Sequence, residues 1–168
     1  YREGIKYHSR SGRAEMFFMN DGITYSVASG IEEIRKESLS ASPAGFPEKS
    51  EKIKYSTIRM SIINGNKDVV ISGEEKSVTK TNFFIGKDQS KWKTNVNSYE
   101  KIKYKNIYDN IDLLYYLNNG SVKYDFIVKP NADLKKIKFK YEGFTGITTN
   151  DQGDLIIDYG YGKVIEAA

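Results

Sequence analysis

The sequence predicts an all-β protein: an antiparallel, jelly-roll-like β-sandwich of about a dozen short strands with little helix. Aromatic residues make up 13% of the 168 residues, with 13 Tyr and 8 Phe, and these types favour pleated, half-buried surfaces. Apolar and polar residues alternate in short runs, as in residues 136–141, which fits a sheet with one buried and one wet face. No segment carries a helical stripe longer than two turns, so we do not expect a parallel α/β architecture.

Two corners rich in Asn, Asp and Gly mark the clearest hairpins. The first corner runs from Asn20 to Gly22 and the second from Asn118 to Gly120. Such corners between β-rich runs predict that the flanking runs pair as antiparallel strands. In chain order, the expected strands are residues 5–8, 15–19, 23–27, 53–63, 68–72, 82–85, 99–104, 111–117, 121–128, 136–141, 144–149, 154–159 and 163–166.

Residues 31–50 differ in composition from the rest of the chain. They hold Pro43 and Pro47, two of the three prolines, together with several Ser and charged residues. This composition favours an extended surface loop or insertion. The length of the chain suits one domain, so we expect residues 1–168 to form a single β-sandwich domain excised from a larger polypeptide. The neighbouring domains of that polypeptide are then expected partners.

The composition excludes several kinds of site and partner. The sequence holds no Cys, which rules out a disulfide framework, a Cys-based zinc site and a thiol nucleophile. The formal net charge is +4, and Lys residues alternate along expected strands, so we expect solvated sheet faces and no nucleic-acid partner. The longest apolar runs are shorter than the ~20 residues of a membrane span, so we expect no membrane insertion.

A series of motifs from residue 82 onward is more specific. The motifs are Asn82-Phe-Phe-Ile-Gly-Lys-Asp-Gln-Ser-Lys-Trp92, Asn110-Ile-Asp-Leu-Leu-Tyr-Tyr116, Tyr124-Asp-Phe-Ile-Val128 and Pro130-Asn-Ala-Asp133. Their order and content resemble the N-terminal module of large secreted bacterial proteins that carry SBBP-type (β-propeller-like) repeats or, in some relatives, adhesion-type repeats. The resemblance covers most of the chain outside residues 31–50.

This resemblance implies a location but no activity. The chain has Asp109-Asn110 where the family usually has Pro-Gly, and Gln89 where Pro is common, and both changes keep residues compatible with turns. The resemblance implies a secreted or cell-surface, extracytoplasmic location in bacteria. The family is one of unknown function, so no catalytic residues carry over.

No catalytic residues are expected, and the protein is not expected to be an enzyme. His8 is the only His, and no Gly-x-Ser-x-Gly elbow accompanies it, so a Ser-His-Asp hydrolase is not indicated. The alternative is a glycoside-acting enzyme domain that uses an Asp pair, because glycosidases need two carboxylates roughly 5–10 Å apart. Asp109 and Asp112, with Asp125 on the neighbouring strand, are the candidates. The competing interpretation gives Asp109 and Asp112 hydrogen bonds in a turn.

An oxygen-rich corner at residues 150–154 suggests a structural calcium ion. Asp151 and Asp154 are the candidate metal ligands, because the segment Asn-Asp-Gln-Gly-Asp places oxygen ligands at close spacing around a Gly. The segment lacks the late Glu of an EF-hand, and the competing interpretation is a simple hairpin turn. No other cofactor is expected.

Aromatic residues between positions 92 and 116 indicate a binding surface. Trp92, the only Trp, is suited to form a platform for sugar rings with nearby Tyr residues, because aromatic faces bury a large area and keep a polar handle. The competing interpretation makes Trp92 a plug at one end of the sandwich. The candidate ligand-binding residues are Trp92, Tyr99, Tyr108, Asp109, Asp112 and Tyr115. We therefore expect a non-catalytic structural or binding module of an exported multidomain protein, with polysaccharide or cell-surface glycans as ligands.

Overall fold

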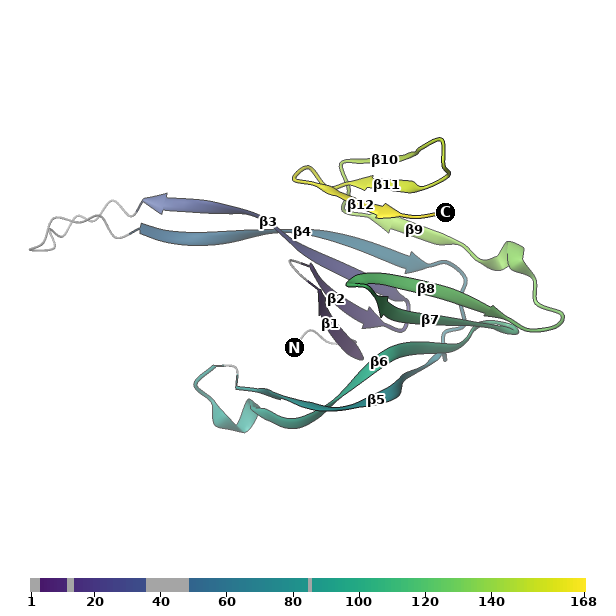
Figure 1. Cartoon of the computed structure of the whole chain (residues 1–168), viewed down its shortest axis with the longest axis horizontal. Helices are drawn as coiled ribbons and strands as arrows, with labels where there is room; N and C mark the ends of the chain where they lie inside the picture. Colours follow the sequence, from purple (N-terminus) through teal and green to yellow (C-terminus); the bar gives the residue numbers. More distant parts are fainter. Residues whose placement is uncertain (1–3, 12–13, 36–48, 85) are drawn as a thin grey trace, which may run out of the picture. The chain divides into compact units, whose positions relative to one another are not determined.

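The computed structural model describes residues 4–11, 14–35, 49–84 and 86–168 (Figure 1). Over these ranges the chain forms twelve strands in three antiparallel sheets, together with two short 3-10 helices. The predicted all-β, antiparallel fold class is confirmed. The residue types explain it, because runs that alternate between apolar and polar side chains bury one face of a sheet and leave the other in water.

Each sheet consists mainly of strands that follow one another along the chain. The five-stranded sheet has the order β1-β2-β3-β4-β9, the four-stranded sheet β5-β6-β7-β8, and the three-stranded sheet β10-β11-β12. This meander differs from the expected jelly-roll-like arrangement. The strand bounds are β1 Tyr7–Ser11, β2 Ala14–Met19, β3 Gly22–Arg35, β4 Lys49–Ile62, β5 Val70–Phe83, β6 Lys93–Tyr108, β7 Ile111–Asn118, β8 Ser121–Val128, β9 Phe139–Glu142, β10 Gly146–Thr149, β11 Leu155–Asp158 and β12 Lys163–Glu166, and the helices are η1 Gln89–Lys91 and η2 Leu134–Lys136.

The prediction of a surface loop over residues 31–50 is wrong at both of its ends. Strand β3 continues to Arg35 and β4 begins at Lys49, and the two strands pair in register from Ile31↔Ile53 to Arg35↔Lys49. The pairing joins backbone groups, so it tolerates the polar and charged side chains that suggested a loop. The middle of the predicted loop, residues 36–48 with both prolines, lies outside the described residues.

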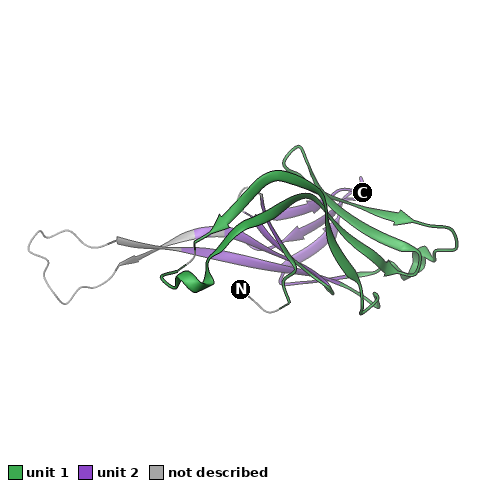
Figure 2. Ribbon diagram, turned by 90° about the horizontal axis from the view of Figure 1, so that it is seen from below, with its two compact units in different colours: residues 1–7, 18–21, 62–139 green, residues 8–17, 22–61, 140–168 purple. Residues whose placement is uncertain are grey.

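The chain divides into two compact units, coloured separately in Figure 2. The first unit comprises residues 1–7, 18–21 and 62–139. Three ring contacts join its four-stranded sheet to residues of β1, β2 and β9: Tyr7 with Tyr99 at 6.0 Å, Phe18 with Tyr115 at 5.6 Å, and Phe126 with Phe139 at 5.8 Å. The core of this unit consists of side chains at most 2% exposed, namely Tyr104, Ile107, Tyr108, Ile111, Leu113 and Tyr115.

The second unit comprises residues 8–17, 22–61 and 140–168. Its most buried apolar side chains are Met16, Ile23, Ile58, Met60 and Ile157. Two hydrogen bonds join β4 and β9 to the three-stranded sheet and its turn: Tyr141 donates from its hydroxyl to the Glu166 carboxylate, and Ser56 Oγ donates to the Tyr159 carbonyl at 3.5 Å. Each unit therefore places strands of one sheet against another sheet, as in a β-sandwich.

The close approach of β3 and β4 at Gly22 generates a prediction. Gly22 has φ +147°, and a Cβ at this position would lie 2.0 Å from the Met60 carbonyl oxygen. We expect Gly22→Ala to lower the free energy of unfolding by more than about 1 kcal/mol. The added Cβ would meet the backbone of the paired strand, so relief of the clash requires a shift of the pairing between Gly22 and Ser61. Urea unfolding measures the change.

Gly30 provides the matched control in the same strand. A Cβ at Gly30 would meet no atom within 4 Å, so Gly30→Ala should change the free energy of unfolding by less than about 0.5 kcal/mol. Equal effects of the two substitutions would contradict the close approach described for Gly22.

Candidate functional site

A buried carboxylate lies at the start of β7. Asp112 is 3% exposed, between the buried apolar residues Ile111 and Leu113. Its Oδ1 accepts hydrogen bonds from the backbone N–H of Asn106 at 2.8 Å and from Lys129 Nζ at 3.0 Å. Its Oδ2 lies 3.6 Å from Lys103 Nζ. A buried charge is tolerated when it is paired and hydrogen-bonded, and Asp112 meets both conditions.

The surroundings of Asp112 keep it ionised. Burial by itself would raise the pKa of this carboxyl, but the hydrogen bonds from Asn106 and Lys129 and the positive charges of Lys129 and Lys103 outweigh burial and lower the pKa below its ordinary value. A carboxyl with a lowered pKa is a poor proton donor near neutral pH, so this geometry suits an anchor better than a general acid.

The Asp112 carboxylate also supports a bulge in β6. The register of β6 against β7 shifts between Tyr104 and Tyr108, and Asn106 in this stretch has a left-handed φ of +52°. The carbonyl of Asn106 accepts a hydrogen bond from Asn66 Nδ2 at 2.6 Å. The bulge is therefore held from both sides, by Asp112 on β7 and by Asn66 in the turn that precedes β5.

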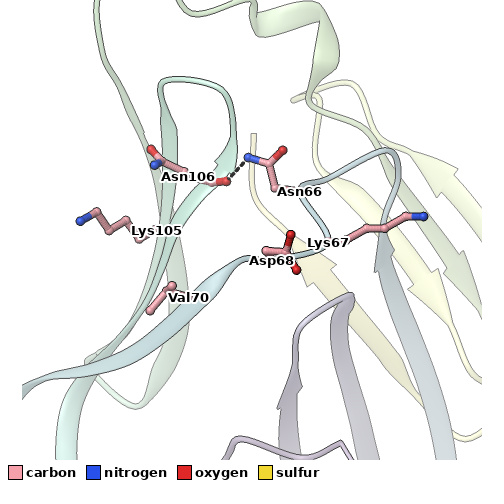
Figure 3. A pocket seen from close by; sticks show the side chains of 6 residues that line it. All are labelled: Asn66, Lys67, Asp68, Val70, Lys105 and Asn106. Carbon is pink, nitrogen blue, oxygen red and sulfur yellow. Dashed lines mark hydrogen bonds between the residues drawn. The ribbon is translucent and has the colours of Figure 1, made fainter.

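A shallow hollow of about 400 Å³ opens beside this bulge (Figure 3). In the close-up, the side chains of Lys67 and Lys105 extend away from each other instead of converging on the hollow. A ligand site normally presents polar groups that converge on one point. The hollow therefore lacks the converging polar groups of a ligand site. It is lined by Asn66, Lys67, Asp68, Val70, Lys105 and Asn106.

The predicted carboxylate pair has separate partners. Asp109 is exposed and lies 3.1 Å from Lys136 Nζ, whereas Asp112 is buried between its own two lysines. Asp125 is exposed on β8 and accepts a hydrogen bond from the hydroxyl of Tyr116. The bonding of these three carboxylates is that of structural ion pairs and surface hydrogen bonds, with nothing that joins them in one cleft.

Two of the predicted platform tyrosines belong to the core. Tyr108 and Tyr115 are each 2% exposed, so neither ring can present a face to a ligand, and the prediction of a platform that includes them is wrong. The Tyr108 hydroxyl donates a hydrogen bond to the Ile63 carbonyl at 2.9 Å. It also accepts a hydrogen bond from the backbone N–H of Lys138 at 3.2 Å. These bonds satisfy the polar end of a buried ring, as burial of Tyr requires.

Tyr99 is half-buried and has a packing role on β6. Its ring meets Tyr7 edge to face, and it lies so close to Gly73 that a Cβ at that glycine would be 2.3 Å from the ring. The Tyr7 hydroxyl in turn accepts the backbone N–H of Gly73 at 2.9 Å. Tyr99 is therefore held by its neighbours, with part of its surface accessible.

Trp92 lies at the end of the β5–β6 hairpin, directly after η1. Its indole Nε1 donates to the Gly86 carbonyl at 3.2 Å, and its half-buried ring meets Phe84 edge to face at 5.1 Å with an angle of 74°. Phe84 is 59% exposed. Asp88 begins η1 by accepting hydrogen bonds from the backbone N–H and the hydroxyl of Ser90. We call Phe84 and Trp92 the aromatic tip.

Phe84 is the residue of this site that the sequence analysis missed. A signal for it exists, because Phe83 and Phe84 are adjacent at the end of an expected strand. Successive side chains of a strand point to opposite faces of the sheet. When the core covers one face, only one of two adjacent Phe rings can therefore be buried.

The corner at residues 150–154 is an internally bonded turn. Asn150 Oδ1 accepts the backbone N–H groups of Gln152 at 3.0 Å and Asp154 at 2.9 Å. The two carboxylate oxygens of Asp154 accept from Asn150 Nδ2 and from the backbone N–H of Ala168, and these bonds lower the pKa of Asp154. Asp151 is exposed. No group of three or more His, Cys, Asp or Glu side chains suited to a metal occurs among the described residues, and calcium at Asp151 and Asp154 stays a prediction.

These features define an all-β module with a buried ionic anchor, formed by Asp112 with Lys103 and Lys129, at one end of β6 and an accessible aromatic tip at the other. The chain belongs to the DUF7948 family, a domain of unknown function whose match covers residues 1–168. No curated protein and no solved structure matches the chain. Among the described residues, no helix is long and apolar enough to cross a membrane.

The anchor generates a prediction about stability and pH. We expect Asp112→Asn to lower the free energy of unfolding by about 2–3 kcal/mol at pH 7, because Lys129 loses a charged hydrogen-bond partner and Lys103 loses an ion-pair partner. The folded-state pKa of Asp112 is lowered, so its stabilisation is present above the unfolded pKa of about 4 and is lost as pH falls through the folded value. Urea unfolding from pH 7 down to pH 3 measures this.

The wild-type and Asp112→Asn curves should therefore converge as the pH falls below about 4. Asp109→Asn is the matched control, because Asp109 is 73% exposed and its pairing with Lys136 is worth less than about 1 kcal/mol. A constant difference between the wild-type and Asp112→Asn proteins across the whole pH range would contradict the charge-based anchor.

Proposed function

We propose that this chain is a non-catalytic binding module of an exported, cell-surface or extracellular multidomain protein, and that it binds polysaccharide through the aromatic tip. The resemblance of its motifs to the N-terminal modules of secreted bacterial proteins with SBBP-type or adhesion-type repeats supports export. The proposal requires no calcium ion, because the aromatic tip consists of the rings of Phe84 and Trp92.

One observation carries the choice of site. Of the predicted platform, Tyr108 and Tyr115 are core residues, while Trp92 remains partly accessible and is joined by the exposed ring of Phe84. The edge-to-face pair holds the two rings at 74° to each other, so together they form a corner with an apolar surface. Sugar rings pack their C–H groups on such surfaces, and aromatic side chains provide large contact area at low entropic cost.

Local hydrogen bonds orient the aromatic tip. The hydrogen bond from Trp92 Nε1 to Gly86 and the cap of η1 by Asp88 hold the Trp ring. The Asn82 side chain accepts the backbone N–H of Asn95 at 2.8 Å and ties the two strands together behind it. A preorganised site loses less conformational entropy on binding.

A glycan array tests the proposal with the whole chain. We expect wild type to bind at least one polysaccharide class, and Phe84→Ala to weaken that binding about tenfold or more, because an exposed Phe ring buried by a ligand contributes on the order of 1.5 kcal/mol. Phe84 is exposed, so its removal should leave the fold intact, and Trp92→Ala should give the same loss.

The control for this experiment is Tyr161→Ala. Tyr161 is 65% exposed, comparable with Phe84, and lies in the other compact unit. It should bind like wild type. An array on which no glycan binds, or on which Phe84→Ala and Trp92→Ala bind like wild type, would overturn the proposal in favour of a scaffold without a ligand.

A further inference from the structure

One segment of this protein, residues 76–99, carries an excess of positive charge. The whole chain has 26 basic and 22 acidic residues, and residues 76–99 hold five Lys and a single Asp. The formal net charge of residues 76–99 is therefore +4. The segment is the outer half of the β5–β6 hairpin together with η1, and it ends in the aromatic tip.

These lysines are exposed, and most lack an acidic partner. The one acidic residue of the segment, Asp88, lies 3.6 Å from Lys91 Nζ and also binds Ser90. The acids that precede the segment, Glu74 and Glu75, face Lys103 and Lys101 instead. Within the described ranges, no ion pair involves Lys76, Lys80, Lys87 or Lys93, and all four are exposed.

The lysines lie on both sides of the aromatic tip. Lys87 follows Gly86, which accepts the Trp92 indole hydrogen bond, and Lys93 follows Trp92 directly. In the strand pairing, Lys93 is opposite Phe83, the neighbour of Phe84, and Lys80 is opposite Asn97 further along the hairpin. Along the chain, lysines therefore precede, separate and follow the two rings, so positive charge lies near the apolar corner, which suits a ligand with both a ring face and a negative charge.

We infer that the aromatic tip binds an anionic polysaccharide, one whose sugar rings carry carboxylate groups and stack on Phe84 and Trp92 while the carboxylates meet Lys80, Lys87 and Lys93. This inference rests on the proposed function and names the ligand class. Uncompensated lysines attract an oppositely charged ligand and also discriminate against neutral ones. A repeating charged chain contacts several of them at once.

The observations favour a polysaccharide over a lipid surface or a nucleic acid. Interfacial membrane binding uses several apolar side chains buried together. At the tip itself, one exposed Phe and a half-buried Trp with a bound N–H form a small apolar area, and the exposed Val78 and Val96 lie further along the hairpin. Single-stranded nucleic acid needs a run of stacking rings along a groove, and the described part of the segment offers one pair.

Trp92 provides a direct readout, because it is the only Trp of the chain. Its emission is titrated with polygalacturonate and, separately, with the same polymer after full methyl esterification, which keeps the rings and removes the charge. We expect the acid form to bind about tenfold tighter than the ester, and this binding to weaken as salt is raised from low to physiological concentration.

The variant Lys80→Gln/Lys87→Gln/Lys93→Gln tests the named lysines. It should weaken binding of the acid form about tenfold and leave binding of the ester unchanged. The matched control, Lys123→Gln/Lys135→Gln/Lys163→Gln, removes the same charge from exposed positions outside the segment and should bind like wild type.

Each other outcome overturns the inference in a distinct way. Equal binding of the acid and the ester would overturn the charge requirement and leave the proposed function in place. Failure of both polymers, together with an empty glycan array, would overturn the proposed function as well. Tighter binding of oligothymidylate or of phosphatidylglycerol vesicles than of the acid polymer would assign the segment to nucleic acid or to lipid.

Discussion

A buried negative charge, the carboxylate of Asp112, holds three successive strands of the first unit together. It sits on β7, binds the backbone of β6 at Asn106, and pairs with Lys103 of β6 and with Lys129 just after β8. Because an unpaired charge in a core is costly, the partners must be in place whenever this carboxylate is buried. The interaction therefore specifies how β6, β7 and β8 align, in addition to contributing to stability.

The alignment has consequences along β6. The bulge at Asn106 shifts the register between Tyr104 and Tyr108, and both of these rings lie in the core. The Tyr108 hydroxyl then reaches the backbone at Ile63 and Lys138, which joins the segments on either side of the four-stranded sheet. The unit thus uses tyrosines as core residues, and at Tyr108 two backbone hydrogen bonds satisfy the buried hydroxyl.

Strand β6 connects the anchor to the proposed binding surface. It runs from the buried Tyr108 to the exposed Lys93, and its outer half pairs with β5 and carries η1. The anchored end is rich in buried side chains, while residues 93–97 at the other end are all exposed. A site placed on an extension of a rigid strand keeps its geometry, and its exposed position leaves room for a polymer longer than the site.

The sequence alone determined the fold class, because two-residue alternation and the Asn-Asp-Gly corners leave antiparallel sheets as the way to bury the apolar side chains. The same alternation predicts that adjacent rings face opposite sides of the sheet, but it does not predict which side is buried. The sequence therefore could not show that Tyr108 and Tyr115 are buried while Trp92 is partly accessible. The β3–β4 pairing beyond Ile31 was missed because backbone hydrogen bonds leave no trace in side-chain composition. Only the tertiary structure brought Lys103 and Lys129 to Asp112, since residues distant in sequence meet through the register of neighbouring strands.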